Sequence, residues 1–310
     1  MIKYFLKTER EGVRSLEKPY VVDEGRIGGE PFAEIAGVGN FSVFKTFDCG
    51  QCFRFDPAAP RRGGYAVSGF ALGRSVSFEQ TEDGALTVFG ATADDFSKVW
   101  LSYLSLDTDY DAIDEAVTTA LDPDGCAVMR RAAEAGRGIR ILRQDPWEAL
   151  CSFIVSQNNN IPRIKKIIAA LCDAYGEDTG DGRTKTFPTA RALADAGEDA
   201  IFALRTGFRA KYITDAARKV ANGEIDLAAV AREEDFSACE AELMKIKGVG
   251  PKVADCALLF GFGKTEAYPV DVWMKKVAAR HFESGPDPLL FGKYAGIAQQ
   301  YLFYMERYGV

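Results

Sequence analysis

The sequence predicts an α+β fold, in which an N-terminal antiparallel β-sheet domain precedes a larger, mainly α-helical domain. Short runs of alternating apolar and polar residues, broken by glycine, occupy residues 39–90, and this period of two is typical of half-buried strands. From residue 92 onward, apolar residues recur at the spacing of amphipathic helices. We therefore divide the chain into residues 1–38, an extension of unclear role, residues 39–107, the α+β domain, and residues 108–310, the helical domain. A cleft should separate the two domains.

Strands are expected wherever the alternation is clearest. The predicted strands are Phe41–Phe47, Gln51–Phe55, Gly64–Gly69, Arg74–Gln80 and Ala85–Gly90. The pattern then becomes helical over Thr92–Leu106, where Phe96, Trp100 and Tyr103 share one face.

Capping residues set several helix boundaries in the second domain. Asp145 followed by Pro146 is typical of a helix start and predicts a helix over Trp147–Val155. Asn222-Gly223 is a stop signal for a helix over Tyr212–Val220. Between these two helices, a third is marked by apolar residues at helical spacing, which are Ile161, Ile164, Ile167, Ile168 and Leu171. Further helices are predicted over Ala238–Ile246, Lys252–Phe260, Val272–Arg280 and Leu289–Tyr308.

The net charge argues against a general nucleic-acid binder, because the chain carries a formal charge of −7 and such proteins are usually basic. Much of this charge is local, however, since residues 105–126 carry seven acids and no lysine or arginine. Two windows contain basic residues and no acid, Asn158–Lys166 and Met244–Lys252. Each is either a phosphate-binding surface or a solvated helix face.

The location of the protein is predicted from what the sequence lacks. There is no apolar run long enough to span a membrane and no segment typical of a secretion signal. The seven cysteines are odd in number and scattered, which fits reduced thiols. We expect a protein with no membrane partner in the cytoplasm, or in the nucleus if the cell is eukaryotic. Cys49 and Cys52 are the one close pair, and no second pair completes a metal site.

The strongest functional signal is a glycine hairpin that opens a helix. Gly248 and Gly250 permit a tight turn and a close approach to another molecule, and Pro251 suits a first helical turn. The amides of such a hairpin can hold an anion such as a phosphate. Lys252 follows at the start of the helix. An amine beside a phosphate cradle suggests chemistry on a nucleic acid.

A carboxylate accompanies this hairpin. Asp271 follows Pro269-Val270 and begins the next predicted helix. Taken separately, these residues also suit two helices packed through a hairpin, with Lys252 in solvent and Asp271 as an N-cap.

Four segments together resemble the helix–hairpin–helix DNA glycosylase superfamily, and within it the 8-oxoguanine DNA glycosylase/AP lyases. They are Asp48–Phe55, Ser152–Arg163, Gly248–Cys256 with Pro269–Asp271, and Tyr294–Gln299. These correspond to the family's Gly-Gln-x-Phe-Arg segment, its triple-asparagine segment, its hairpin and its C-terminal recognition helix. The resemblance implies base-excision repair by a monomer whose partner is double-stranded DNA containing a damaged purine.

The resemblance also implies the catalytic residues. Lys252 would attack the sugar C1′, form a Schiff base and allow β-elimination, while Asp271 would stabilise positive charge on the sugar. No cysteine follows Cys256, so the iron–sulfur cluster of some superfamily members is not expected and no cofactor is implied. The hairpin at Gly248 and Gly250 is a candidate site for a monovalent cation.

Roles in DNA recognition follow from the same resemblance. Gly50 would accept the N7–H that distinguishes 8-oxoguanine from guanine, Gln299 would read the Watson–Crick edge, and Phe303 and Cys256 would sandwich the base. On the DNA side, the orphaned base would meet Asn158, Arg163 and Arg209, and Phe208 would wedge into the stack.

Two residues depart from the family's animal members, which carry tyrosine in place of Phe208 and histidine in place of Trp273. Phenylalanine can still act as a wedge, but tryptophan cannot give a cationic phosphate contact. His281, the one histidine, is expected to be structural.

Three alternatives stay open on the sequence. The chain could be a related glycosylase for another damaged base, a DNA-binding module without catalysis, or a small-molecule enzyme. Lys252 argues against glycosylases that act through water, and the presence of both Lys252 and Asp271 argues against a non-catalytic module. Only the acidic charge favours a small-molecule enzyme.

Overall fold

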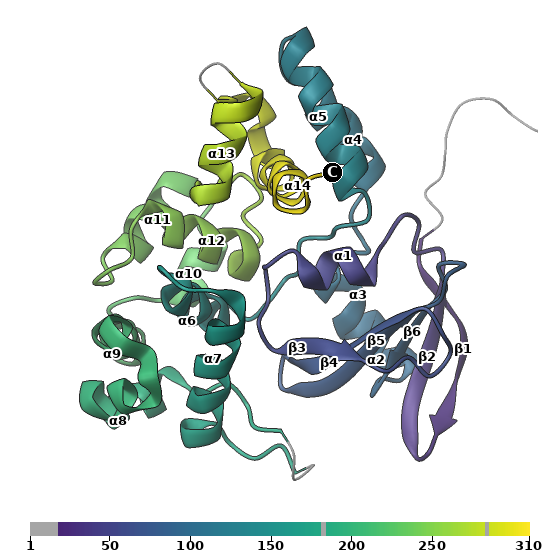
Figure 1. The fold of residues 1–310 in the computed structure, drawn as a ribbon. Coiled ribbons are helices and arrows are strands. Elements are labelled where there is room, and N and C mark those ends of the chain that lie inside the picture. The colour runs from purple at the N-terminus through teal and green to yellow at the C-terminus, as the bar shows by residue number, and fades with distance from the viewer. Residues whose placement is uncertain (1–17, 181–183, 283–284) are drawn as a thin grey trace, which may run out of the picture.

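The first domain is built on an antiparallel sheet. The structure is a computed structural model that describes residues 18–180, 184–282 and 285–310. In these residues the sheet has six strands in the order β1-β2-β6-β5-β4-β3 (Figure 1). The strands are β1 Tyr20–Ile27, β2 Glu30–Ala36, β3 Phe55–Ala58, β4 Tyr65–Ala71, β5 Arg74–Gln80 and β6 Leu86–Phe89.

Short helical segments share an aromatic core with the sheet. These segments are α1 Val43–Asp48, α2 Ala93–Asp95, the π-helix η1 Phe96–Trp100 and α3 Leu101–Tyr103. Phe78 of β5 lies at the centre of this core, with its ring centroid 5.3 Å from that of Phe47 and 5.4 Å from that of Trp100. Phe78 and Trp100 are fully buried. The sheet domain therefore has a core of its own, which gives firm support to the loop that leads from α1 to β3.

The rest of the described chain is helical. Its elements are α4 Tyr110–Thr118, α5 Pro123–Gly136, α6 Pro146–Ser156, α7 Ile161–Tyr175, α8 Ala190–Ile201, the π-helix η2 Phe202–Thr206, the 3₁₀ helix η3 Gly207–Arg209, α9 Ala210–Ala221, α10 Leu227–Arg232, α11 Phe236–Met244, α12 Pro251–Phe262, α13 Val272–His281, the 3₁₀ helix η4 Pro288–Tyr294 and α14 Ala295–Tyr308. The α+β fold class and the helices predicted between residues 147 and 280 are thus confirmed, with shifted ends. The helix predicted over Leu289–Tyr308 is wrong for its first six residues, because the 3₁₀ helix η4 runs to Tyr294, with a non-helical backbone at Gly292, and α14 begins only at Ala295.

Helices α6 and α12 lie at the centre of the helical domain. Every residue of α6 from Ala149 to Val155 is buried, and most of α12 is buried as well. The two helices come close because Gly261 faces Ala149, where a Cβ on Gly261 would lie 2.8 Å from the alanine methyl. Lys252, near the start of α12, is therefore carried by one of the best-packed elements of the molecule.

The strand predicted over Phe41–Phe47 is wrong, since this segment forms α1. Ser42 caps the helix by accepting a hydrogen bond from the Lys45 amide at 3.2 Å. The buried residues Val43, Thr46 and Phe47 have helical spacing. The apolar residues of this short run fit a period of two as well as one of 3.6, so alternation alone did not decide between strand and helix.

The strand predicted over Gln51–Phe55 is also wrong for its first four residues, because β3 begins only at Phe55. Gln51 is buried and uses its side chain to bond three backbone groups. Its Nε2 donates to the carbonyls of Thr46 at 2.9 Å and Arg140 at 2.8 Å, while its Oε1 accepts from the Leu142 amide at 2.8 Å. A side chain takes the place of strand pairing in this loop.

Part of the segment 1–38, an extension of unclear role on the sequence, belongs to the sheet. Residues 20–36 form β1 and β2, and β2 pairs with β6 through Phe32 opposite Phe89 and Ile35 opposite Leu86. Strand β1 was not predicted because nearly all of its residues face solvent and show no alternation of apolar and polar residues. Residues 1–17 lie outside the described part of the chain.

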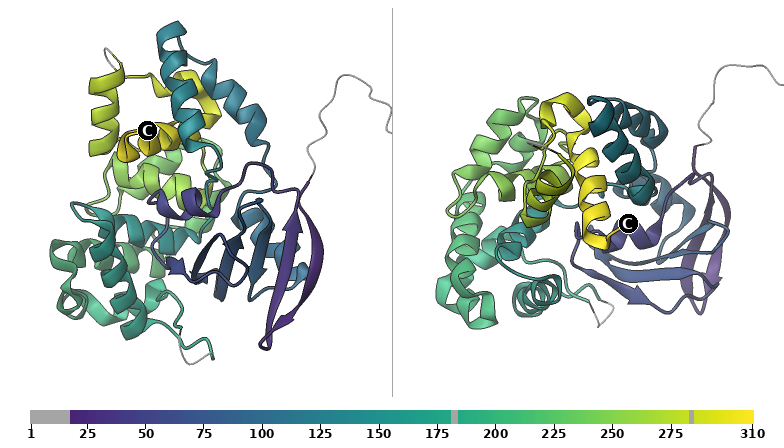
Figure 2. Two further views of the ribbon diagram at one scale, coloured as in Figure 1. Left: turned by 45° about the vertical axis from the view of Figure 1, so that its right-hand side comes forward. Right: turned by 45° about the horizontal axis from the view of Figure 1, so that its top comes forward.

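Helix α14 connects the two domains. It contacts α5, α13 and η4 in the helical domain, and it reaches the end of α1 in the sheet domain (Figure 2). Gln300 donates to the Cys49 carbonyl at 3.0 Å, and Arg307 and Tyr308 donate to the Asp48 carbonyl at 3.0 and 3.1 Å. The loop after α1 is thereby fixed against the helical domain.

None of the helices in the described ranges combines the length and the apolar composition needed to cross a membrane.

Candidate active site

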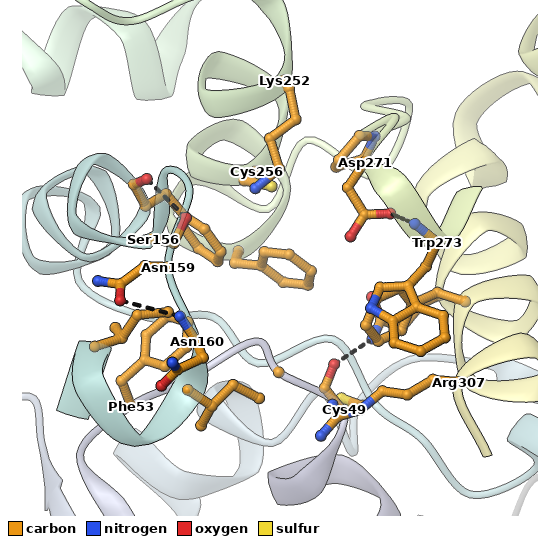
Figure 3. A pocket seen from close by; sticks show the side chains of 18 of the residues that line it. Cys49, Phe53, Ser156, Asn159, Asn160, Lys252, Cys256, Asp271, Trp273 and Arg307 are labelled. Atoms are coloured by element: carbon orange, nitrogen blue, oxygen red, sulfur yellow. Dashed lines mark hydrogen bonds between the residues drawn. The ribbon is translucent and has the colours of Figure 1, made fainter. Parts of the chain in front are cut away.

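A cavity of about 430 Å³ lies between the sheet domain and the helical domain, and we call it the central cavity. It is the cleft that the sequence predicted between the two domains. Its lining comes from the loop after α1, from α6, the start of α7, α12, α13 and α14 (Figure 3). Six of the predicted site residues line it: Gly50, Lys252, Cys256, Asp271, Gln299 and Phe303.

The hairpin between α11 and α12 positions Lys252. Gly248 has a φ of +79°, and a Cβ there would lie 2.5 Å from the Tyr212 ring, so only glycine fits. Gly250 is the N-cap residue of α12 and Pro251 starts the helix, as predicted. The Lys252 side chain runs along the cavity toward Cys256, with its Nζ 5.7 Å from the centre of the Phe153 ring (Figure 3). The amine is thus held inside the cavity.

Asp271 faces the same cavity from α13. One carboxylate oxygen, Oδ1, caps the helix by accepting from the amides of Trp273 and Met274, both at 2.9 Å. The other oxygen points into the cavity (Figure 3). Asp271 is therefore an N-cap, and it also presents a free carboxylate oxygen to whatever occupies the cavity.

Two thiols line the cavity, Cys49 and Cys256, and burial raises the pKa of the Cys49 thiol to about 12. Cys256 is also held in its neutral form. Its side chain is buried, and this burial raises the pKa of the thiol to about 11, although the nearby Lys252 ammonium acts in the opposite direction. A thiol with this pKa is protonated at neutral pH and is a poor nucleophile. The chemistry of this cavity is therefore assigned to the lysine.

Gly50 forms part of a rigid wall. Its φ of +81° is in the left-handed region, and a Cβ there would lie 3.5 Å from Arg307. The residues on either side are fixed, because Gln300 and Arg307 hold the carbonyls of Cys49 and Asp48 and Gln51 holds three further backbone groups. We call residues 48–51 the fixed wall of the central cavity.

Gln299 is the least satisfied polar group in the cavity. The residue is only 4% exposed, and its Oε1 accepts no hydrogen bond within the described structure. A buried polar atom without a partner is destabilising, so such atoms are rare and often await a ligand. Phe303, one turn further along α14, presents its ring to the same cavity. The pair suits a flat ligand with a hydrogen-bonding edge.

The triple-asparagine segment is divided between two roles. Asn158 does not line the cavity; it is exposed and has a φ of +47°. Asn159 and Asn160 do line the cavity, and Asn160 also caps α7 by accepting from the Arg163 amide at 3.0 Å. We call residues 158–163 the open wall. Arg163 is exposed on it, and Phe208 lies exposed on η3.

Arg209 lies directly behind the open wall. It is only 2% exposed, and its guanidinium donates to the carbonyls of Gln157 at 2.9 Å, Asn158 at 2.9 Å and Thr206 at 3.2 Å. In the free protein the side chain therefore supports the backbone of Asn158, and its contact with the orphaned base stays a prediction. Gln157 and Asn158 lie about fifty residues away in the chain, so these two bonds could not be predicted from local sequence.

Arg307 and Trp273 are among the cavity residues that had no predicted binding role. Arg307 lies one helical turn after Phe303, with its guanidinium 5.9 Å from the centre of that ring. The spacing of four residues on a predicted helix was the available signal. Trp273, a departure from the family pattern, lines the cavity and has the Lys276 ammonium 4.1 Å from its ring centre. The Lys276 ammonium therefore lies beside Trp273, the residue that replaces the histidine of the family's animal members.

Metal ligands are not grouped in the described ranges, where no cluster of three or more His, Cys, Asp or Glu residues could hold a metal. All seven cysteines are free and buried. The monovalent cation at the hairpin stays a prediction. His281 lies outside the cavity, with its Nε2 3.3 Å from Glu306.

Two family models match consecutive parts of the chain, which together span residues 35–289. The 8-oxoguanine DNA glycosylase N-terminal domain matches residues 35–150, and the HhH-GPD superfamily of base-excision DNA repair proteins matches residues 151–289.

Individual proteins give the same result. The N-glycosylase/DNA lyase of Saccharomyces cerevisiae is 39% identical over 160 residues, which cover 47% of this chain and 43% of the yeast protein. The curated relatives are matched over about half of their length. A solved structure of MBOgg1 in complex with a low-affinity DNA ligand is 38% identical, covers 93% of this chain and 98% of that one, and has a TM-score of 0.81.

A further solved structure is the Clostridium acetobutylicum 8-oxoguanine glycosylase/lyase in complex with double-stranded DNA containing cytosine opposite 8-oxoguanine. It is 33% identical, covers 93% of this chain and 99% of that one, and has a TM-score of 0.81.

Proposed function

This chain belongs to the 8-oxoguanine DNA glycosylase family, and we propose that it excises 8-oxoguanine from duplex DNA and then cleaves the strand by β-elimination. The observation that carries the proposal is the shared cavity of Lys252 and Asp271, an amine and a half-free carboxylate that face the same space. We further propose that the protein acts as a monomer on double-stranded DNA, in the compartment that holds the DNA.

The reaction requires a flipped nucleotide, because the sugar C1′ and the base edge are hidden in a duplex. Extrusion of the nucleotide requires a few kcal/mol of unstacking energy, which contacts with the protein must supply. The amides of the hairpin at Gly248 and Gly250 suit a phosphate of the lesion strand. Asn158 and Phe208 are both exposed, and they would fill the vacated space and wedge between bases, respectively.

Lys252 then carries the chemistry. Its unprotonated amine forms a bond to C1′ as the glycosidic bond breaks and the base leaves with the bonding electrons. The bound lysine nitrogen loses a proton, and the ring oxygen gains one as the C1′–O4′ bond breaks, which gives a Schiff base between Lys252 and C1′. Water then accepts a C2′ proton, a C2′=C3′ double bond forms, and the 3′ phosphate leaves with the electrons of its C3′–O bond. The free carboxylate oxygen of Asp271 stabilises the positive charge that develops on the sugar. Both the glycosylase and the lyase step therefore use the same amine.

Recognition of the base is assigned to the fixed wall and α14. The Gly50 carbonyl would accept the N7–H of 8-oxoguanine, a hydrogen bond that guanine cannot donate. A single hydrogen bond of this kind discriminates by about 1–3 kcal/mol when its loss leaves a group unpaired. The unpaired Oε1 of Gln299 would accept from the Watson–Crick edge, and Phe303 and Cys256 would contact the two faces of the ring.

The test is an excision assay on duplexes with one 8-oxoguanine opposite cytosine, with the strand break measured before and after alkali. We expect breaks without alkali from the wild-type protein and none from Lys252→Gln. Lys245→Gln is the matched control, since Lys245 lies just before the hairpin and pairs with Glu242 at 2.6 Å; it should cleave like wild type.

The alternatives give different results in this assay. Breaks that appear only after alkali would show a glycosylase that acts through water. Release of an alkylated base but not of 8-oxoguanine would show a different lesion specificity, and binding without base release would show a non-catalytic module.

A further inference from the structure

A second cavity, of about 440 Å³, lies on the far side of the open wall, and we call it the basic cavity. Asn160 and Pro162 line both this cavity and the central cavity, so the turn at the start of α7 separates the two. The rest of the lining comes from α7 and η2 and includes Arg163, Lys166 and Arg205. None of the functions assigned so far uses the last two residues.

The charge of the basic cavity is uncompensated. No acidic residue lines it, and none of its three cations makes an ion pair or a side-chain hydrogen bond within the described residues. The neighbouring Lys165 shows the contrast, because its Nζ pairs with Asp56 at 2.8 Å. Burial, and then the positive charge of Arg163, lower the pKa of Arg209. A concave site with unpaired charge of one sign attracts the opposite charge, here an anion.

Arg205 also has a strained backbone. Its φ of +63° and ψ of +25° lie in the left-handed region, which costs energy for any residue with a Cβ other than asparagine or aspartate. A side-chain hydrogen bond closes this turn, since the Thr206 hydroxyl donates to the Ile201 carbonyl at 2.9 Å. An exposed arginine in a strained position at the edge of a basic cavity points to a role in binding.

We propose that the basic cavity binds a backbone phosphate of the DNA strand opposite the lesion, with Arg205 and Lys166 as the contacts. This inference rests on the proposed function. When the damaged nucleotide enters the central cavity, the orphaned base and its strand stay on the other side of the open wall, where the basic cavity opens. Lysine and arginine without neighbouring acceptors suit a phosphate, which positions the duplex without reading its sequence.

The test measures DNA binding by fluorescence anisotropy against salt concentration, in Lys252→Gln protein so that the substrate stays intact. Adding Arg205→Gly or Lys166→Ala should reduce the slope of log affinity against log salt by about 0.9 each, the value for one lost phosphate contact. Glycine suits the left-handed backbone, so the melting temperature of the Arg205→Gly protein should not fall.

The matched control is Arg131→Ala, which removes the same charge from an exposed position on α5 and should leave the slope unchanged. Helix α5 lies at the opposite end of the molecule from α7 and α8 (Figure 1).

A second arm locates the contact. Neutral methylphosphonates replace the phosphates that flank the base opposite the lesion. We call the Lys252→Gln protein the parent. The methylphosphonate duplex should bind the parent as weakly as the intact duplex binds the protein that also carries Arg205→Gly. For the Arg205→Gly protein, the methylphosphonate duplex and the intact duplex should bind with the same affinity. An unchanged salt slope for Arg205→Gly would overturn the inference. So would a loss of affinity on Arg205→Gly substitution that is as large for the methylphosphonate duplex as for the intact duplex. If the parent itself fails to bind the lesion duplex, the proposed function fails as well, and this is visible before any basic-cavity variant is compared.

Discussion

The two walls of the central cavity are built in opposite ways. In the fixed wall, residues 48–51, the flanking carbonyls and the Gln51 side chain are hydrogen-bonded to other parts of the protein. In the open wall, residues 158–163, the Asn158 and Arg163 side chains are exposed, and neither makes a side-chain hydrogen bond within the described structure. Asn159 and Asn160 of the open wall bond to the backbone. The difference indicates that the surface that reads the base is formed before DNA binds, whereas the open wall keeps the Asn158 and Arg163 side chains available for DNA.

The largest effect is expected from breaking the fixed wall. Gln51→Ala leaves the Thr46 and Arg140 carbonyls and the Leu142 amide without this partner in a buried region, and should lower the free energy of unfolding by about 3–4 kcal/mol. Urea denaturation measures this change.

Asn158→Gly is the matched change on the open wall. Because Asn158 is exposed and its left-handed backbone suits glycine, stability should change by less than about 0.5 kcal/mol while binding of the lesion duplex weakens. Equal destabilisation by the two variants would contradict the contrast between the walls.

A second prediction separates the two oxygens of Asp271. Asn is as good an N-cap as Asp, so Asp271→Asn should keep the stability of the protein within about 0.5 kcal/mol. Single-turnover base excision should nevertheless slow by about 10²–10³-fold, because the charge facing the sugar is lost. If the variant lost stability in proportion to its loss of rate, Asp271 would act only as the N-cap of α13 and not on the sugar.

A third prediction contrasts the cavity side of α12 with its packed side. Three residues after Lys252, burial and then the nearby Glu240 raise the pKa of Asp255 to about 7. Between pH 4 and 7 the folded protein therefore retains a proton that the unfolded chain releases, so the free energy of unfolding falls as pH rises through this window.

Asp255→Asn should lack this decline. With allowance for the partial exposure of the carboxyl, the variant should be more stable than wild type by about 2 kcal/mol above pH 7 and equal to it below pH 4. Thermal melts across this range measure the difference, and parallel pH profiles for the two proteins would exclude the assignment.

The smallest expected effect concerns Gln299. Gln299→Met removes the unpaired buried oxygen and should raise the free energy of unfolding by about 1 kcal/mol. The same change should lower kcat/KM for the lesion about tenfold, which corresponds to about 1.4 kcal/mol of lost recognition. Loss of stability in Gln299→Met would mean that the oxygen already has a partner in the free protein.

The sequence was sufficient for the parts of the site that are local in the chain. The hairpin, Lys252 and the N-cap Asp271 are encoded by short runs with strong backbone preferences, and Lys252 and Asp271 meet in the predicted cleft. The fixed wall could not be predicted in the same way, since Gln51 bonds to groups about ninety residues away. Arg209 shows the same limit, because its burial depends on carbonyls contributed by another segment.

The central claim is that the Lys252 amine bonds covalently to the damaged nucleotide. The direct measurement is borohydride reduction of the protein with an 8-oxoguanine–cytosine duplex, followed by peptide mapping of the protein–DNA adduct. Our account predicts a stable adduct on Lys252 in the wild-type protein and none in Lys252→Gln. An adduct on another residue, or base release without any adduct, would contradict it.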